Sequence, residues 1–126
     1  MKEKEILDVL RQLLKNSYSP YSKFRVAAVI VTDSGNIYKG CNVENASYGM
    51  TLCAERVAAT AAVSAGEKKF RQIFLITDSA KPEFPCGACL QFLAEFNPKL
   101  KITTYAGDGR KKSAKLSDIL KSKFKF

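Results

Sequence analysis

Three cysteines at fixed spacing constrain the fold of this 126-residue chain more than any other feature. Cys53 is followed by Glu55, and Cys86 and Cys89 form a Pro-Cys-x-x-Cys motif whose first cysteine lies 33 positions after Cys53. Three thiolate ligands on one zinc ion leave the fourth tetrahedral position open, as catalytic zinc sites do. A carboxylate beside a water molecule at that position can transfer protons. The spacing therefore predicts a catalytic zinc site that brings two distant segments together.

The fourth cysteine leaves a second interpretation open. Cys41 could join Cys53, Cys86 and Cys89 in a closed structural site with four thiolates, and Glu55 would then be an ordinary carboxylate at a helix start. Such sites more often use two Cys-x-x-Cys pairs, whereas this chain has one. Cys41 follows an apolar run and suits the role of a small buried hydrophobic residue. The open catalytic site is the favoured interpretation.

Length and composition predict one domain over residues 1–126, with 46% hydrophobic residues to form a small core. Residues 1–5 are charged and residues 6–14 are amphipathic, so we expect no signal peptide. No apolar run approaches the roughly 18 residues of a membrane span. We therefore expect a cytoplasmic protein without a membrane segment, whose cysteines stay reduced and available to a metal.

The net charge of +9 is concentrated at one end of the chain. Residues 1–98 carry 12 basic and 10 acidic residues (+2), and residues 99–126 carry 9 basic and 2 acidic residues (+7). A basic segment of this kind can attract the phosphates of a nucleic acid. It can equally be a solvated surface that keeps the protein soluble. The second explanation is favoured, so nucleic acid is not expected as a partner.

Hydrophobic periodicity predicts the first elements of the fold. Apolar residues three and four positions apart predict an amphipathic helix over 3–15. The unbroken apolar run within 24–32 predicts a strand that is covered on both faces. A turn at 33–36 then leads to an antiparallel strand at 37–40.

The rest of the chain alternates helices with strands. Helices are expected at 52–65 and 87–96, and strands at 73–77 and 101–105. A fifth short strand or an irregular segment precedes a short helix expected at 116–120. This order predicts an α/β fold, a three-layer αβα sandwich with a mixed β-sheet and helices on both faces.

The three cysteines fall at the starts of two predicted helices. Cys53 and Glu55 lie in the first turn of the helix over 52–65. Cys86 comes just before the next helix, and Cys89 lies in its first turn. Free amide groups and the helix dipole favour a thiolate at such positions. Two helix N-termini are therefore expected to present one metal ion with its ligands.

A polar loop over 41–49 follows the second strand. Asn42, Glu44 and Asn45 could present amides and a carboxylate to a ligand that carries hydroxyl groups. The alternative is an asparagine-rich turn without a ligand.

Together these motifs resemble those of the small cytidine deaminases of the homotetrameric type, whose zinc is held by three cysteines. The resemblance runs over nearly the whole chain and rests on Tyr21-Ser22-Lys23-Phe24, Gly40-Cys41-Asn42-Val43-Glu44-Asn45-Ala46, Cys53-Ala54-Glu55-Arg56 and Pro85-Cys86-Gly87-Ala88-Cys89. It implies a Zn²⁺ cofactor and the hydrolytic deamination of cytidine and deoxycytidine to uridine, deoxyuridine and ammonia, a reaction of pyrimidine salvage.

The resemblance also implies roles for single residues. Cys53, Cys86 and Cys89 would hold zinc, and zinc-bound hydroxide would attack C4 of the pyrimidine. Glu55 would protonate N3 and then pass a proton to the departing ammonia. Arg56 resembles the family residue that donates hydrogen bonds to ligand sulfurs; its alternative is a surface cation.

Substrate-binding roles follow from the same resemblance. Asn42 and Glu44 would bind ribose hydroxyls, and Phe24 would pack on the base. Backbone groups near Ala46 and Ala54 would contact the edge of the pyrimidine.

Phe124 matches a C-terminal aromatic residue that reaches into the site of a neighbouring subunit in a homotetramer with shared active sites. The alternative is that Phe124 packs against its own terminal helix.

Two positions depart from the family pattern: Leu90 stands where an arginine is usual, and Lys121 stands where a proline is usual. Leu90 could alter the charge near zinc, the subunit packing or the range of substrates. Activity on modified cytosine nucleosides or a nucleoside analogue therefore stays open, as does a deaminase fold that binds nucleic acid.

Overall fold

The computed structural model describes residues 1–124 of the chain. Its elements, in order along the chain, are α1 (Glu3–Leu14), β1 (Val26–Thr32), β2 (Ile37–Cys41), the 3-10 helix η1 (Tyr48–Met50), α2 (Ala54–Ser64), β3 (Phe70–Thr77), α3 (Gly87–Ala94), β4 (Lys101–Tyr105), β5 (Lys111–Lys115) and α4 (Leu116–Ile119). Within residues 1–124, no helix combines the length and the apolar composition that a membrane crossing requires.

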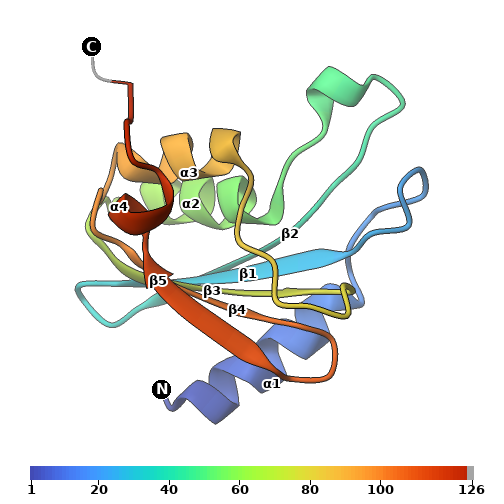
Figure 1. Cartoon of the computed structure of the whole chain (residues 1–126), viewed down its shortest axis with the longest axis horizontal. Coiled ribbons are helices and arrows are strands. Elements are labelled where there is room, and N and C mark those ends of the chain that lie inside the picture. The colour runs from blue at the N-terminus through green and yellow to red at the C-terminus, as the bar shows by residue number, and fades with distance from the viewer. Residues whose placement is uncertain (125–126) are drawn as a thin grey trace.

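The five strands form one mixed sheet in the order β2-β1-β3-β4-β5. Strands β3 and β4 are parallel, and the other neighbouring pairs are antiparallel. Helix α1 covers one face of the sheet, and helices α2 and α3 lie on the other (Figure 1). The predicted three-layer αβα sandwich is confirmed. The undecided fifth segment is a strand, β5, which forms one edge of the sheet.

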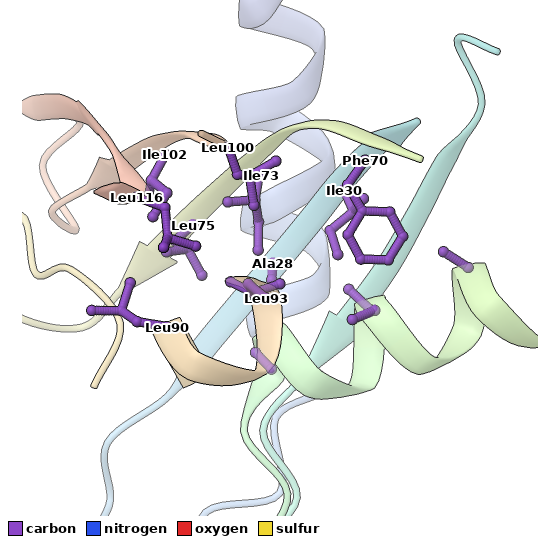
Figure 2. Close-up of a cluster of buried hydrophobic side chains, with 14 of the residues drawn as sticks. Ala28, Ile30, Phe70, Ile73, Leu75, Leu90, Leu93, Leu100, Ile102 and Leu116 are labelled. Atoms are coloured by element: carbon purple, nitrogen blue, oxygen red, sulfur yellow. The ribbon is translucent and has the colours of Figure 1, made fainter. Parts of the chain in front are cut away.

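Strand β1 contributes to the hydrophobic core on both sides of the sheet, as its unbroken apolar sequence predicts. Ala27 and Val29 pack with α1 residues such as Leu10. Ala28 and Ile30 belong to the larger cluster beneath α2 and α3 (Figure 2). Every one of these strand residues is fully buried. Two packed layers therefore hold β1 in place.

Leu90, the first departure from the family pattern, lies in this larger cluster (Figure 2). Its side chain is only 4% exposed and packs in the core with residues that include Leu93 and Leu116. The hydrophobic effect therefore explains a leucine at this position, because an arginine there would bury its charge.

Helix α2 packs unusually close to strand β2. A side chain at Gly40 would bring its Cβ to 2.6 Å from both the carbonyl oxygen of Ala54 and the amide nitrogen of Ala58. The α2 residues at this contact are Ala54, Val57 and Ala58, and the buried face of the helix continues with the alanines at 59 and 62. Small residues on both sides let the two backbones touch, which fixes the start of α2 relative to the sheet.

Most predicted boundaries agree with the structure to within two residues, with two differences that matter. Helix α2 begins at Ala54, because Cys53 has an extended backbone and serves as the N-cap rather than lying in the first turn. Strand β3 begins at Phe70, three residues before the expected start, because antiparallel pairing with β1 extends it. Cys41 is half-buried at the end of β2, so the prediction of a buried residue there is wrong.

The carboxylate of Glu67 ties the β1–β2 hairpin to the loop after α2. It accepts hydrogen bonds from Thr32 Oγ1 at 2.7 Å and Asn36 Nδ2 at 2.9 Å, and from the hydroxyls of Ser34 and Tyr38. These donors, with Ser34 the strongest, lower the pKa of Glu67 to about 2.

Replacing Gly40 with Ala should lower the free energy of unfolding by about 1–3 kcal/mol, the usual cost of forcing extra volume into a packed site. Urea denaturation measures this loss. Gly49→Ala is the matched control, because a Cβ at Gly49 meets no atom within 4 Å. Equal stability of the Gly40 variant and the original protein would contradict the close contact.

Glu67→Gln should lower the melting temperature at pH 7, and the loss should disappear in acid. A carboxylate whose pKa is lowered from 4.5 to about 2 on folding stabilises the protein above pH 4.5. That stabilisation is lost as the pH falls from about 4.5 to 2. Thermal unfolding at pH 7, 5, 4 and 3 tests this, with the exposed Glu95→Gln as control. A difference that stays constant with pH would contradict the role of the charge.

Candidate active site

The structure brings three of the four cysteines together at the starts of two helices. Cys53 is the N-cap of α2, Cys86 is the N-cap of α3, and Cys89 lies in the first turn of α3. Their Sγ atoms lie within 4.8 Å of one another. Two thiolates bound at about 2.3 Å to one tetrahedral zinc are about 3.8 Å apart, so small shifts suffice to bind the ion. Cys41 lies outside the group, so the described residues do not assemble four thiols.

The thiols of Cys53 and Cys89 differ in pKa, and Arg56 places a positive charge beside them. A hydrogen bond with Cys89 and the nearby Arg56 guanidinium lower the pKa of the Cys53 thiol to about 5. The hydrogen bond with Cys53 and burial raise the pKa of Cys89. Arg56 Nη2 donates to Cys53 Sγ at 3.4 Å, whereas its buried Nε has no acceptor among the described residues. Three sulfur ligands suit a zinc ion. The Arg56 guanidinium beside them offsets part of the negative charge that the three sulfurs carry when they bind as thiolates.

Glu55 is buried next to the sulfurs, in the first turn of α2. Its side chain is only 6% exposed. Burial raises the pKa of Glu55 to about 7, and the negative charge of Cys53 acts in the same direction. A carboxyl group with this pKa can both accept and release a proton near neutral pH.

Cys53, Cys86 and Glu55 line a cavity of about 440 Å³, whereas Cys89 is buried behind them and is not a lining residue. Ala54 lines it beside them, and the aromatic ring of Phe24 lines it from the segment before β1. The loop after β2 contributes Asn42 and Glu44. Ala46 is not among the lining residues, and neither is Phe124 of the same chain. Asn45, the third candidate of the polar loop, does not line it either, so the predicted ligand-binding residues meet at one cavity with these three exceptions.

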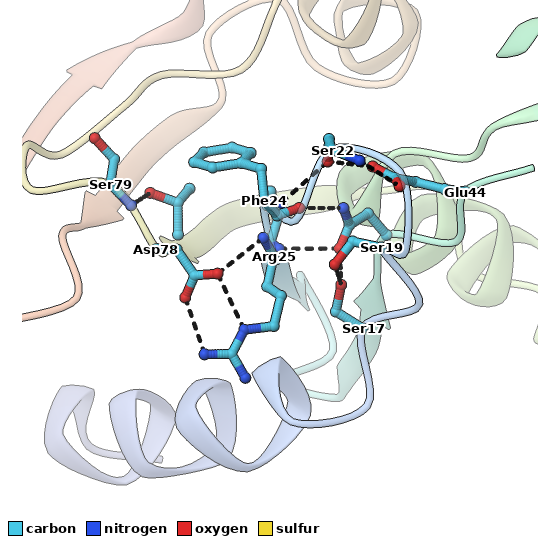
Figure 3. Close-up of polar contacts among 11 residues, drawn as sticks. Ser17, Ser19, Ser22, Phe24, Arg25, Glu44, Asp78 and Ser79 are labelled. Carbon is cyan, nitrogen blue, oxygen red and sulfur yellow. Dashed lines mark hydrogen bonds and ion pairs between the residues drawn. The ribbon is translucent and has the colours of Figure 1, made fainter.

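Asn42 and Glu44 also hold the segment that carries Phe24. Asn42 Oδ1 accepts hydrogen bonds from Val26 N at 3.0 Å and from the Ser17 hydroxyl, and Asn42 Nδ2 donates to Phe24 O at 2.8 Å. Glu44 Oε1 accepts from the backbone amides of residues 21 and 22 at 3.0 and 3.1 Å, and Oε2 accepts from the hydroxyl of residue 22 (Figure 3). Through these hydrogen bonds the polar loop fixes the position of the segment that carries Phe24.

A short antiparallel bridge fixes this loop relative to the cysteines. The amide of Val43 donates to the carbonyl of Leu52, and the reverse hydrogen bond has the same length of 2.9 Å. Leu52 immediately precedes Cys53, so the bridge sets the spacing between the loop and the first sulfur.

The opposite wall of the cavity was not predicted from the sequence. Thr77, Ser79, Glu83, Phe84 and Pro85 line it, and all but Thr77 belong to the loop between β3 and α3. Thr104 Oγ1 holds this loop by donating to Glu83 O at 2.6 Å, and the Lys112 ammonium lies 4.5 Å from the centre of the Phe84 ring. The one sequence signal was that Phe84 and Pro85 directly precede Cys86.

An ion pair joins the two walls. Arg25 Nε and Nη2 donate to the carboxylate of Asp78 at 3.0 and 3.2 Å, and the Arg25 amide donates to the same carboxylate at 3.0 Å (Figure 3). Arg25 follows Phe24, and Asp78 begins the loop that leads to Cys86. The pair therefore links the segment that carries Phe24 to the loop that leads to Cys86.

Phe124 is 76% exposed near the end of the described chain. An aromatic ring with this exposure contributes little to the packing of its own terminal helix. Its large apolar surface is therefore left uncovered within the described part of the chain.

Comparison with known proteins gives one consistent result. The family model for the cytidine and deoxycytidylate deaminase zinc-binding region matches residues 1–104. The cytidine deaminase of Mycoplasma genitalium is 34% identical over 122 residues, which cover 95% of this chain and 93% of that protein. The cytidine deaminase of Sporosarcina psychrophila is 44% identical over 97 residues, which cover 75% and 71%. A crystal structure of the cytidine deaminase from Burkholderia pseudomallei has a TM-score of 0.93 at 35% identity, covering 98% of this chain and 100% of that one.

Purified protein should contain one zinc ion per chain, because one group of three thiols is available. Cys41→Ser should keep this content, whereas Cys86→Ser should lose most of it. Elemental analysis after dialysis measures both. Loss of zinc from the Cys41 variant would instead support a closed site with four thiolates.

Proposed function

The chain belongs to the cytidine and deoxycytidylate deaminase family, and we propose that it catalyses the zinc-dependent hydrolytic deamination of cytidine and deoxycytidine. The observation that carries this proposal is a group of three thiols beside a buried carboxyl group, with Cys53, Cys86 and Glu55 lining one nucleoside-sized cavity. Residues 1–126 are taken as one deaminase domain.

Cys53, Cys86 and Cys89 would hold the zinc ion, with Arg56 donating a hydrogen bond to Cys53. Zinc, when bound, lowers the pKa of a water molecule and so supplies a nucleophile at neutral pH. Glu55 takes the proton that this water loses and delivers it to N3 of the pyrimidine. Glu55 then transfers a second proton from the added hydroxyl group to the amino group at C4, which leaves as ammonia.

The remaining hydrogen-bonding capacity of the loop after β2 suits a sugar hydroxyl. Both lone pairs of Asn42 Oδ1 are used within the chain, but one N–H of its amide stays available. Glu44 Oε2 accepts one hydrogen bond and can accept another. A hydroxyl that accepts from Asn42 and donates to Glu44 satisfies both groups. The 3′ oxygen of a polynucleotide carries no proton to donate, which favours free nucleosides.

The charge of the cavity favours nucleosides over nucleotides as well. Glu44, Glu55 and Glu83 line it, and no lysine or arginine is among the described residues that do. A phosphate group would lie among carboxylates without a cation to pair with. The cavity therefore disfavours deoxycytidylate and single-stranded nucleic acid, despite the net charge of +9.

Assembly into a homotetramer with shared sites completes the proposal. Exposed apolar side chains lie at or beside the cavity: Leu52 lines it, and Tyr21, next to the lining residue Ser22, packs against Tyr48. Contiguous apolar surface of this kind is typical of contacts between subunits. The exposed ring of Phe124 would cover the cavity of a neighbouring copy. Three reduced thiols suit the cytoplasm, where the reaction would serve pyrimidine salvage.

Zinc-loaded protein should convert cytidine and deoxycytidine, as followed by the change in ultraviolet absorbance. Deoxycytidylate, free cytosine and single-stranded oligonucleotides should react poorly. Glu55→Gln should keep its zinc and its fold while turnover falls by at least about 10²-fold, because the proton-transfer group is gone. The exposed Glu95→Gln serves as control.

Near-normal turnover of the Glu55 variant would remove this residue from the mechanism. Efficient deamination of oligonucleotides, falling steeply as salt rises, would contradict the nucleoside specificity.

A further inference from the structure

The side-chain amide of Gln91 binds the backbone of Phe124 through both of its polar groups. Gln91 Nε2 donates to Phe124 O at 3.1 Å, and Gln91 Oε1 accepts from Phe124 N at 2.8 Å. One primary amide thus satisfies the donor and the acceptor of a single residue, as a neighbouring strand does in a sheet. Two hydrogen bonds to one residue fix its backbone in orientation as well as in position.

These two bonds hold a segment that has little other support. We define residues 121–124, which follow α4, as the C-terminal arm. Among the described residues, the arm makes no hydrogen bond other than the two with Gln91. Figure 1 shows the chain leaving α4 and running past the α3 layer, away from the sheet. Gln91 is therefore the anchor of the arm.

Helix α3 connects this anchor to the metal ligands. Gln91 follows Cys89 by two residues, about 3 Å along the helix axis. Leu90, between them, is buried in the core and prevents the helix from turning about its axis. Gln91 itself is half-buried beside these two residues. The backbone of the arm is thus held by the same rigid helix that holds Cys89.

The anchored residue exposes its own side chain. The backbone of Phe124 is bound by Gln91, yet 76% of Phe124 is exposed, and the ring does not line the cavity of its own chain. The contact thus fixes the backbone and leaves the large apolar ring available to another surface.

We propose that Gln91 is a positioning residue that anchors the C-terminal arm so that Phe124 covers the nucleoside cavity of a neighbouring copy. This inference rests on the proposed deaminase function. Gln91 acts through Phe124 and touches neither the substrate nor the metal. Without the anchor, the arm is in its binding-competent position for a smaller fraction of the time, which lowers the apparent affinity for the nucleoside by that fraction.

A double-mutant cycle in the full-length protein tests the anchor. Gln91→Ala should raise KM for cytidine roughly ten-fold, the scale of two lost hydrogen bonds, and leave kcat and zinc content near their original values. Phe124→Ala should raise KM as well. In the Phe124→Ala background, Gln91→Ala should add no further change, because anchoring an arm without its ring achieves nothing. Gln12→Ala, at an exposed glutamine of α1 on the opposite face of the sheet, is the control.

Trypsin cleavage after Lys123 gives a second measurement that does not depend on activity. Mass spectrometry follows the loss of residues 124–126 under native conditions. Gln91→Ala should be cut several-fold faster than the original protein, and Gln12→Ala should be cut at the original rate. Gln91→Ala could be cut faster than the original protein while the original protein deaminates neither cytidine nor deoxycytidine. The proposed function would then be wrong, and the role of Gln91 in holding the arm would be supported.

Two results would overturn the inference. In the first, Gln91→Ala lowers the zinc content or kcat equally in the original protein and in the Phe124→Ala background. The substitution then acts through α3 and Cys89, and not through the arm. Equal cleavage rates for the original protein and Gln91→Ala show that Gln91 does not hold the arm.

Discussion

The contact between strand β2 and helix α2 determines where most of the site lies. At Gly40 the strand backbone touches the backbone of α2, leaving no room for a side chain. After Gly40, the chain of β2 continues directly to Asn42 and Glu44. On the helix side of the contact, Cys53 and Glu55 lie at the start of α2. One close approach between two backbones therefore sets the distance from Cys53 to the polar side chains of Asn42 and Glu44. The alanine-rich sequence of α2 follows from this contact, because larger side chains would separate the helix from the sheet.

The thiols supply the second connection, between helices that are distant in sequence. Cys53 starts α2, whereas Cys86 and Cys89 start α3, and strand β3 lies between the two helices along the chain. A hydrogen bond between the Cys53 and Cys89 sulfurs lowers the pKa of Cys53 and raises the pKa of Cys89. A bound divalent cation would remove this difference in pKa between the two thiols, because each sulfur could then be negatively charged. The folded chain thus presents three thiols from the starts of α2 and α3 in an arrangement that a zinc ion could bind.

The sequence predicted what depends on local pattern and missed what depends on tertiary contact. The cysteine spacing predicted the three thiols that lie together, and the unbroken apolar run predicted β1 as a strand covered on both sides. Strand β5 stayed undecided, because its lysines hide any alternation and its pairing with β4 stabilises it. Nothing local shows that Glu83 faces the cavity, since Thr104 on another strand holds its backbone. The hydrogen bonds of Gln91 escape a reading of the sequence for the same reason.

The position of β5 in the sheet gives the basic C-terminal part of the chain a structural role. This strand forms an edge of the sheet, and its exposed residues include Lys111, Lys112 and Lys115. An open edge is a template on which the strand of another molecule can add, and rows of lysines oppose such addition through repulsion. Copies are thereby discouraged from pairing edge to edge along β5. The charge that invites a nucleic-acid interpretation in the sequence thus protects the protein against fibrous aggregation.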